Sequence, residues 1–326
     1  MSRPLRIQYP GAVYHVTCRG NDRKHIFLDD EDRKKLLRIL GSSLNIYSVK
    51  LHAYVLMDNH FHLLVETPLG NLSEFMRHFN ISYTSFFNRR HSRVGHLYQG
   101  RYKSILVEKE SYLSVLSRYI HLNPIRIQQA ENSRPEEQLE RLFRYTWSSL
   151  PGYLRGEQSG DLVDYTLVMA EYGGNTERGR ALYAKQLISD ITTGLNVKEN
   201  VFGQSILGSD AFINWIRETA VNEIETPEQP TAGVVRHYQR KIVIMDMIEK
   251  ELGKSHQDLK NEKGSMRRLA MDILYRHSGL KGVEIGALFG LHYSAVSQER
   301  KRLREEIARD SSLAEMMRKL EDICQQ

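Results

Sequence analysis

The segment DNHFHLLV, at residues 58–65, places two histidines two positions apart in an apolar run. Alternate side chains of an extended strand point to the same face, so His60 and His62 share one face and Phe61 points to the other. Two imidazoles on one face can chelate a divalent cation, with carboxylate or amide oxygen from another element completing the shell. The alternative is a pair of surface or hydrogen-bonded histidines, because an HxH triplet occurs often by chance.

A second pattern, RYIHLNP at residues 118–124, supplies a phenol and an amide one helical turn apart. Tyr119 and Asn123 stand at i and i+4, which places them on one face of a helix. A phenol can attack phosphorus and form a covalent phosphotyrosine, and Asn123 would supply a metal ligand. Because the reference pKa of a phenol is about 10, a metal or base must assist it at neutral pH. The alternative is a core tyrosine followed by an Asn-Pro that ends a helix.

The first 150 or so residues alternate between strand and helix patterns, and these elements must position both motifs. The apolar patterns predict strands at 12–17, 51–57, 61–65 and 102–107, and helices from residue 29, at 72–89 and at 111–122. The helix from residue 29 begins with acidic residues, which suit its positive end. The order β-α-β-β-α-β-α predicts an α+β fold, a ferredoxin-like antiparallel sheet with helices on one face.

The remainder of the chain is predicted to be helical. Residues 226–233, TPEQPTAG, contain two prolines and a glycine and are the best linker. The predicted domains are residues 1–153, a helical connecting region at 154–230, and an all-α domain at 231–326. The function of the connecting region is left open.

The segment VEIGALFGLHYSAVS, at residues 283–297, has the spacing of a helix-turn-helix. Gly290 would occupy the turn, where a positive φ is needed. Three apolar side chains would hold the two helices together, namely Ile285, Leu288 and Val296. The second helix would present His292, Ser294 and Gln298 to a DNA groove, with Arg300, Lys301, Arg302 and Arg304 available for phosphates. The alternative is an ordinary helical hairpin with a glycine corner.

Four blocks of the sequence together closely resemble the IS200-like, or REP-associated, tyrosine transposases of the HUH single-strand endonuclease superfamily. They are YPGAVYHVTCRGNDRKHIFLDD, VLMDNHFHLLVETP, LYQGRYKS and SRYIHLNPIR, and the resemblance extends over residues 1–153. It implies that His60 and His62 bind a divalent metal, Mg²⁺ or Mn²⁺, and that Tyr119 is the nucleophile. Asn123 stands where related transposases place a polar metal ligand, commonly glutamine. The implied partner is single-stranded or hairpin DNA, including REP-like palindromes.

The C-terminal segment is similar to the DNA-binding domain of the bacterial replication initiator DnaA over residues 235–310. The matching positions are Arg267, Ala270, Glu284, Ile285, Gly286, Phe289, Gly290, His292, Ser294 and Val296. The sequence departs at Leu291 and Tyr293, where that family has charged residues that help to read its DNA site. The resemblance therefore implies the fold and duplex DNA binding, but not that family's sequence preference.

Basic residues near the two motifs are candidates for contacts with the DNA backbone. They are Arg19, Arg23, Lys24, Arg101 and Lys103. Tyr98 and Tyr102 are candidates for stacking on bases, although strand tyrosines usually pack in a core. Three further histidines are expected to be structural, namely His15, His52 and His121.

The composition limits the classes of function. Lys and Arg number 46 and Asp and Glu 40, so the net charge of +6 is only mildly basic and permits a polyanionic partner without requiring one. Without an apolar span or a secretory signal, we expect a cytoplasmic, nucleoid-associated protein with no membrane partner, as a monomer or homodimer. The sequence favours an enzyme that cleaves and rejoins single-stranded or hairpin DNA through a 5′-phosphotyrosine. A non-catalytic DNA-binding regulator is the alternative, and a small-molecule metal hydrolase ranks last.

Overall fold

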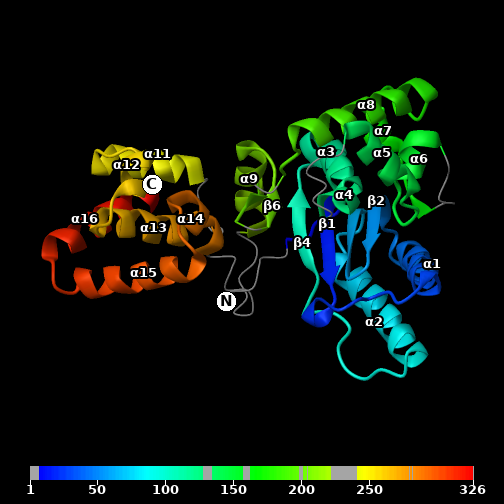
Figure 1. The fold of residues 1–326 in the computed structure, drawn as a ribbon, viewed down its shortest axis with the longest axis horizontal. Helices are drawn as coiled ribbons and strands as arrows, with labels where there is room; N and C mark the ends of the chain where they lie inside the picture. Colours follow the sequence, from blue (N-terminus) through cyan, green and yellow to red (C-terminus); the bar gives the residue numbers. More distant parts are fainter. Residues whose placement is uncertain are drawn as a thin grey trace. The chain divides into compact units, whose positions relative to one another are not determined.

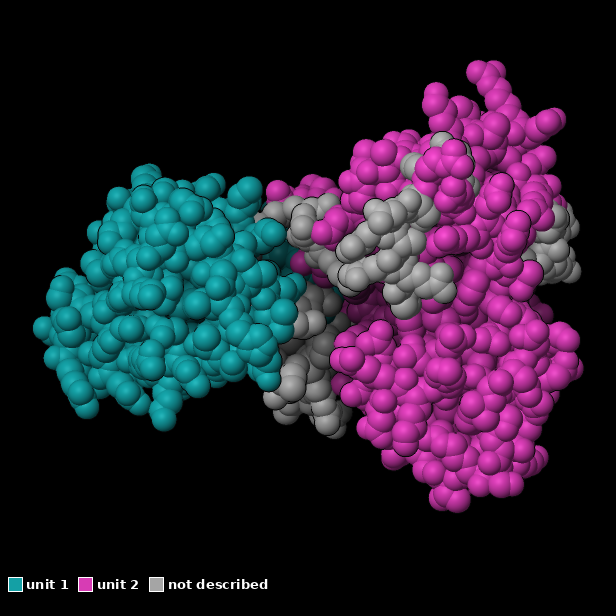
Figure 2. All heavy atoms as spheres, in the orientation of Figure 1, with its two compact units in different colours: residues 1–5, 202–206, 213–326 teal, residues 6–201, 207–212 magenta. Residues whose placement is uncertain are grey.

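The computed structural model describes residues 7–127, 134–156, 162–197, 201–203, 205–221, 241–278, 280 and 282–325. The chain divides into two compact units (Figure 2), which comprise residues 6–201 with 207–212, the N-terminal unit, and residues 1–5, 202–206 and 213–326, the C-terminal unit. The N-terminal unit therefore contains residues 6–153 of the first predicted domain. The predicted linker at 226–233 lies outside the described residues.

An antiparallel sheet forms the centre of the N-terminal unit (Figure 1). Its main strands are β1 (Ala12–Arg19), β2 (Lys50–Met57), β3 (His60–Thr67) and β4 (Lys103–Val107). The strand order is β2-β3-β1-β4, followed by the two-residue strands β6 (Ile206–Leu207) and β5 (Val201–Phe202). Strand β1 pairs with both β3 and β4, and β2 pairs with β3, all antiparallel. The α+β class with an antiparallel sheet is thus confirmed.

Two long helices, α1 (Asp30–Tyr47) and α2 (Leu72–Arg90), pack beside each other on one face of the sheet. Helix α1 begins where Asp29 caps it, because the Asp29 carboxylate accepts a hydrogen bond from the backbone N–H of Asp32. Helix α2 buries apolar side chains at helical spacing, and the ring of Phe79 lies 5.6 Å from that of Phe61. Phe61 points away from the face that carries His60 and His62.

The helix that carries Tyr119, α3 (Lys109–His121), covers the other face of the sheet, where its Tyr119 ring contacts His15. His15 and Cys18 lie on opposite faces of β1, and Cys18 contacts Asn80 of α2. The expectation that helices cover only one face is therefore corrected. The sequence pattern shows which residues of a strand are apolar, but not whether both of its faces are buried. Every residue of β3 is buried, so helices must cover both sides of the sheet there.

The remaining helices of the N-terminal unit are η1 (Asn21–Arg23), α4 (Asn123–Ile127), α5 (Pro135–Arg144), α6 (Leu150–Arg155), α7 (Thr166–Ala170) and α8 (Glu177–Thr193). Helix α9 (Asp210–Ile216) begins in the N-terminal unit, and its residues from Ile213 onward belong, with the π-helix η4 (Arg217–Val221), to the C-terminal unit. A cluster of buried tyrosines joins α6 to α8, with the rings of Tyr153 and Tyr183 stacked 4.9 Å apart. These helices extend the core well beyond the predicted boundary at residue 153.

The described part of the C-terminal unit beyond residue 240 consists of helices. They are α11 (Lys241–Leu252), α12 (His256–Asn261), α13 (Ser265–His277), α14 (Gly282–Phe289), α15 (Tyr293–Ile307) and α16 (Ser311–Gln325). Ile285 and Val296 are fully buried in their shared core and Leu288 packs against it. Gly290, between α14 and α15, has a φ of +67°, which glycine adopts without a steric penalty. Gly286 is equally constrained, because a Cβ there would lie 2.4 Å from the carbonyl oxygen of Leu291.

Within the described residues, none of the helices is both long and apolar enough to cross a membrane.

Candidate active site

The histidine pair lies at the beginning of β3, directly after the turn formed by residues 58 and 59. Strand pairing places His60 opposite Arg19 of β1 and His62 opposite Thr17. Both imidazoles lie on the face covered by α3, and their ring centroids are 5.1 Å apart. Both residues are buried, at 6% and 8% exposure. The alternation of the strand therefore places the two rings together, as the sequence indicates.

His60 is held in the form that can ligate a cation. Its Nδ1 lies 2.7 Å from the Oδ1 of Asn59, which accepts a hydrogen bond and directs the proton to Nδ1. Burial, and to a smaller extent the nearby Arg19 cation, lowers the pKa of His60 to about 4. The imidazole is therefore neutral at pH 7, with Nε2 carrying the lone pair. Orientation of a ligating histidine by a hydrogen bond to its other nitrogen is the usual arrangement in metal sites.

A third histidine joins the pair to Tyr119. The Nε2 of His15 lies 2.8 Å from the Nδ1 of His62, and the two rings are stacked with centroids 5.1 Å apart. On its other side, His15 meets the ring of Tyr119 edge-on at 5.9 Å. The structure thus brings together three segments that are distant in the sequence. We expected His15 to be structural, and no spacing in the sequence indicates its contact with His62.

The side chain of Arg126, on α4, covers the ring of Tyr119. Its guanidinium carbon lies 4.5 Å from the ring centroid, within the range of a cation–π interaction. Burial lowers the pKa of Arg126, and a hydrogen bond with Tyr119 partly offsets that effect. Tyr119 itself is 7% exposed. Sequence reasoning missed Arg126, although its position seven residues after Tyr119 was the available signal.

Asn123 lies at the first position of α4, directly after the break in the helix that follows Tyr119. Its amide nitrogen donates to the backbone carbonyls of Tyr119 and Ile120, at 3.0 and 3.1 Å. This fixes the side chain and directs its two donors into the helix end, so that the amide oxygen is the atom suited to a cation. Asn123 also confirms the predicted break, since it precedes Pro124.

A donor set of two imidazoles and one amide oxygen would fit a divalent cation with water or phosphate in the remaining positions. Within the described residues, no group of three His, Cys, Asp or Glu side chains could hold a metal ion on its own. The assignment of the Asn123 amide oxygen as the completing ligand stays a prediction.

Five cations surround this end of the sheet. All five are exposed, and they are Arg19, Arg23, Lys24, Arg101 and Lys103. Arg19 lies opposite His60, and Lys103 lies opposite Thr17, the neighbour of His62, so both belong to the face that carries the histidines. Backbone hydrogen bonds from Gly20 to Asn59 and from Gln99 to Arg19, both 2.8 Å, tie the loops together here. Exposed cations on tied loops suit phosphate contacts.

The other sequence candidates in this unit are structural. The hydroxyl of Tyr98 is buried without a hydrogen-bond partner, and burial raises its pKa well above the usual value. Its ring packs edge-on against Phe61, and Tyr102 is only 9% exposed, so the expected base stacking by these two tyrosines does not fit. His52 bonds to Glu66, and His121 bonds to Tyr183 and Ser149, as expected for structural histidines.

In the C-terminal unit, His292 precedes the first turn of α15 and its Nδ1 lies 2.9 Å from the Oγ of Ser294. His292, Ser294 and Gln298 are exposed on this helix. The Arg300 guanidinium instead stacks on Tyr275, and its Nε donates to the buried Asp272 at 2.7 Å. Arg300 therefore supports the core of the unit.

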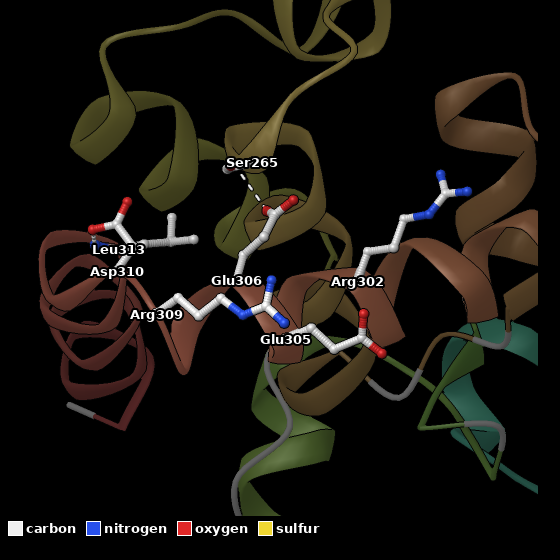
Figure 3. A pocket seen from close by; sticks show the side chains of 7 residues that line it. All are labelled: Ser265, Arg302, Glu305, Glu306, Arg309, Asp310 and Leu313. Carbon is white, nitrogen blue, oxygen red and sulfur yellow. Dashed lines mark hydrogen bonds between the residues drawn. The ribbon is translucent and has the colours of Figure 1, made fainter.

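Arg302 is exposed but lies among carboxylates. It pairs with Glu299 at 2.7 Å and lines a pocket whose other members are Ser265, Glu305, Glu306, Arg309, Asp310 and Leu313 (Figure 3). Three acidic side chains and two arginines line that pocket, and this excess of negative charge disfavours the binding of a polyanion.

Comparison with known proteins finds one family to which the segment that carries the site is similar. Residues 8–123 match the family described as "Transposase IS200 like". A similar solved structure is described as "Structure of the REP associates tyrosine transposase bound to a REP hairpin", with 16% identity, a TM-score of 0.39 and coverage of 51% of this chain and 96% of that chain. No curated protein matches this chain. The matched residues 8–123 carry the histidine pair, His15 and Tyr119, and this segment is similar to the IS200-like transposases.

Proposed function

We propose that this protein is a metal-dependent DNA strand transferase that cleaves and rejoins single-stranded or hairpin DNA through Tyr119. One observation carries the proposal, namely the contact of His15 with both His62 and Tyr119. It joins the phenol and the histidine pair in one cluster at the end of the sheet where exposed cations gather. The similarity of residues 8–123 to the IS200-like transposases supports the same class of reaction.

In the proposed reaction, the Tyr119 oxygen forms a bond to phosphorus as the bond from phosphorus to the 3′ oxygen breaks. The phenolic proton passes to solvent, and the departing 3′ oxygen takes up a proton to become a hydroxyl. The 5′ phosphate stays on Tyr119 as an ester, and a 3′-hydroxyl from another strand reverses the step. One ester replaces another, so no nucleotide triphosphate is required.

We propose that His60, His62 and Asn123 hold Mg²⁺ or Mn²⁺, which when bound supplies Lewis-acid stabilisation of the charge on the phosphate. The chain's own residues hold the DNA in place. Arg19 and Lys103, on the face of the histidines, contact the phosphates next to the scissile bond, and Arg23, Lys24 and Arg101 contact the strand further away. Such contacts position the backbone for an in-line attack.

The C-terminal unit is proposed to bind duplex DNA with a helix-turn-helix formed by α14 and α15, through His292, Ser294 and Gln298. Binding nearby duplex would raise the local concentration of the cleavage substrate. The exposed residues at the beginning of α15 favour this role. They also motivate the alternative function, a DNA-binding regulator that does not use its nuclease domain.

The deciding experiment incubates the full chain with 5′- and 3′-labelled hairpin oligonucleotides, including REP-type palindromes, in Mn²⁺, Mg²⁺ or EDTA. We expect a covalent adduct that survives denaturation, requires the metal and carries the label 3′ to the cut. Tyr119→Phe should abolish it while hairpin affinity is retained. Tyr112→Phe, on the same helix α3 two turns earlier, is the matched control and should leave the adduct unchanged.

An adduct that persists in Tyr119→Phe refutes the assignment of the nucleophile. Salt-sensitive duplex binding without cleavage of any hairpin favours the regulator. In that case Ser294→Ala and Gln298→Ala should weaken duplex binding, since each good base contact contributes about 1–3 kcal/mol of discrimination.

A further inference from the structure

Helix α3 carries a buried stripe of polar residues beside Tyr119. Ser114, Ser117, Arg118 and His121 stand at i, i+3, i+4 and i+7 and lie along one side of the helix. Their exposures are 1%, 0%, 7% and 0%. A polar stripe at core positions is unusual, because an apolar stripe is the ordinary way to bury a helix. The family match ends at residue 123, so the partners of this stripe lie outside the matched segment.

The hydroxyls of the stripe bond to tyrosines that follow the matched segment. Ser114 Oγ lies 2.9 Å from the hydroxyl of Tyr172, and Ser117 Oγ lies 2.9 Å from the hydroxyl of Tyr183, on α8. His121 Nδ1 lies 2.8 Å from the same Tyr183 hydroxyl. Burial raises the pKa of Tyr172 and Tyr183, so both phenols remain protonated.

A buried ion pair completes the interface. Arg118 Nε donates to Asp190 Oδ2 of α8 at 2.5 Å, and its Nη1 donates to Ser114 Oγ at 2.9 Å and to the Tyr172 hydroxyl at 2.5 Å. Asp190 is 6% exposed and also accepts from Gln186. The carboxylate and guanidinium are thus both desolvated and bonded, the condition under which a buried pair is tolerated.

The hydrogen bonds and the ion pair between α3 and its partners depend on direction, so they specify one rotation of α3. An apolar interface would let α3 rotate or slide with little change in contact area, whereas each hydrogen bond here breaks if the helix turns, leaving a desolvated polar group unmatched. Adjacent helical residues differ by about 100° in direction, so the orientation of Arg118 sets that of Tyr119. Fixing one side of α3 to α8 therefore directs Tyr119 at His15 on the other side.

We propose that residues 166–193 form a brace that positions the nucleophile, with Arg118 and Asp190 as positioning residues. This inference rests on the proposed function of Tyr119 and assigns a role to part of the connecting region. The brace holds the rotation of α3 through bonds to Arg118, Ser114 and Ser117, and contacts no reacting atom. Its contribution is to accuracy of placement rather than to net stability.

The test replaces the ion pair by apolar residues of similar size, Arg118→Met with Asp190→Leu in the full chain. Such replacements of buried pairs are often neutral or stabilising, so the fold should persist. We expect an unchanged urea midpoint and hairpin affinity but a covalent adduct that forms about 100-fold more slowly, the cost of a displacement near 1 Å. Lys254→Met with Glu262→Gln removes an ion pair of the C-terminal unit and is the control, with an unchanged rate.

A folded double variant that forms the adduct at the wild-type rate overturns the brace and leaves the proposed function intact. If the apolar pair does not fold, Tyr172→Phe removes the hydroxyl shared by Ser114 and Arg118, and the same drop in rate is expected. Rate loss that merely tracks a lower urea midpoint in either variant would also refute positioning.

A measurement that needs no catalysis separates this inference from the proposed function. In protein labelled with 3-fluorotyrosine, the ¹⁹F resonance of Tyr119 is assigned by its loss in Tyr119→Phe. We expect one sharp resonance in the wild type and a broadened or split one in the double variant, because α3 then samples several rotations. An unchanged resonance overturns the brace even if no DNA is ever cleaved. A changed one supports it even if the wild type forms no adduct.

Discussion

The Nε2 of His15 lies 2.8 Å from the Nδ1 of His62, across a pair of antiparallel strands. Since one of these nitrogens must donate to the other, His15 restricts which tautomer and which orientation His62 adopts. Replacing it should therefore affect cation binding. We expect His15→Phe, which keeps an aromatic ring but no hydrogen bond, to lower Mn²⁺ affinity about 10- to 100-fold. Calorimetric titration of the full chain measures this, and His96→Phe, an exposed position, is the control.

The lowered pKa of His60 gives a pH dependence to cation binding. Because the pKa is about 4, the ring remains neutral as the pH falls from 7 to 5 and gains a proton only near pH 4. The Arg19 cation contributes to this lowering, so Arg19→Met should move the pKa upwards, towards the ordinary value of about 6.5. An NMR titration of the metal-free histidine rings follows the shift. Arg23→Met should leave it unchanged, and a downward movement in Arg19→Met would contradict the assigned cause.

His121 should make the stability of the N-terminal unit sensitive to acid. Burial lowers its pKa to about 3, whereas the unfolded chain takes up the proton near the ordinary value of about 6.5. Between these values the unfolded state binds one more proton, so the free energy of unfolding falls as the pH decreases, by about 1.4 kcal/mol per pH unit. The contribution is fully present above pH 6.5.

His121→Gln should reduce the slope by about 1.4 kcal/mol per pH unit, leaving the share of His60, whose pKa is also lowered, to about 4. It should also lower stability at pH 7 by about 1–3 kcal/mol, because Tyr183 and Ser149 lose a partner. Urea unfolding at pH 5.0 and 6.5 measures the difference in slope. Both pH values lie above the range in which carboxyl groups usually titrate. Glu66 does not contribute, because its hydrogen bond to His52 is the main reason that its pKa is held at about 2. An equal slope in both proteins would show that another group takes up the proton.

Arg126 is expected to act on the charge that develops at Tyr119. Arg126→Gln should slow adduct formation about 100-fold, as removal of one oriented donor typically does. Arg126→Lys should retain part of the rate, since it keeps the charge and loses the planar donor geometry. Arg155, which stacks on Phe143 at 4.8 Å, offers a matched control in Arg155→Gln. Quench-flow measurement with saturating hairpin distinguishes a slower step from weaker binding, and equal rates for both glutamine variants would exclude the role.

The strands and helices of the N-terminal unit follow closely from local pattern. The helix predicted at 72–89 is Leu72–Arg90, and the strand predicted at 12–17 extends to Arg19. The added residues of β1 have a non-local cause, since they pair with His60 and its neighbours on β3. The sequence shows the end of an element when local capping or periodicity determines that end. It does not show the end when pairing with a distant strand lengthens the element.

The candidate site likewise has one part that the local sequence predicts and another that it does not. Residue type and strand alternation alone place His60 and His62 on one face, because the side-chain period of a strand is a property of the backbone. Residue spacing likewise places Tyr119 and Asn123 one helical turn apart and predicts the break in the helix at Asn123. The contacts of His15 and Arg126 and the bonds from α3 to α8 depend on strand register and helix packing. These bring together groups as much as 104 residues apart, as His15 and Tyr119 are. Only the tertiary structure decides these, because burial and hydrogen bonding between distant segments have no local signature in the chain.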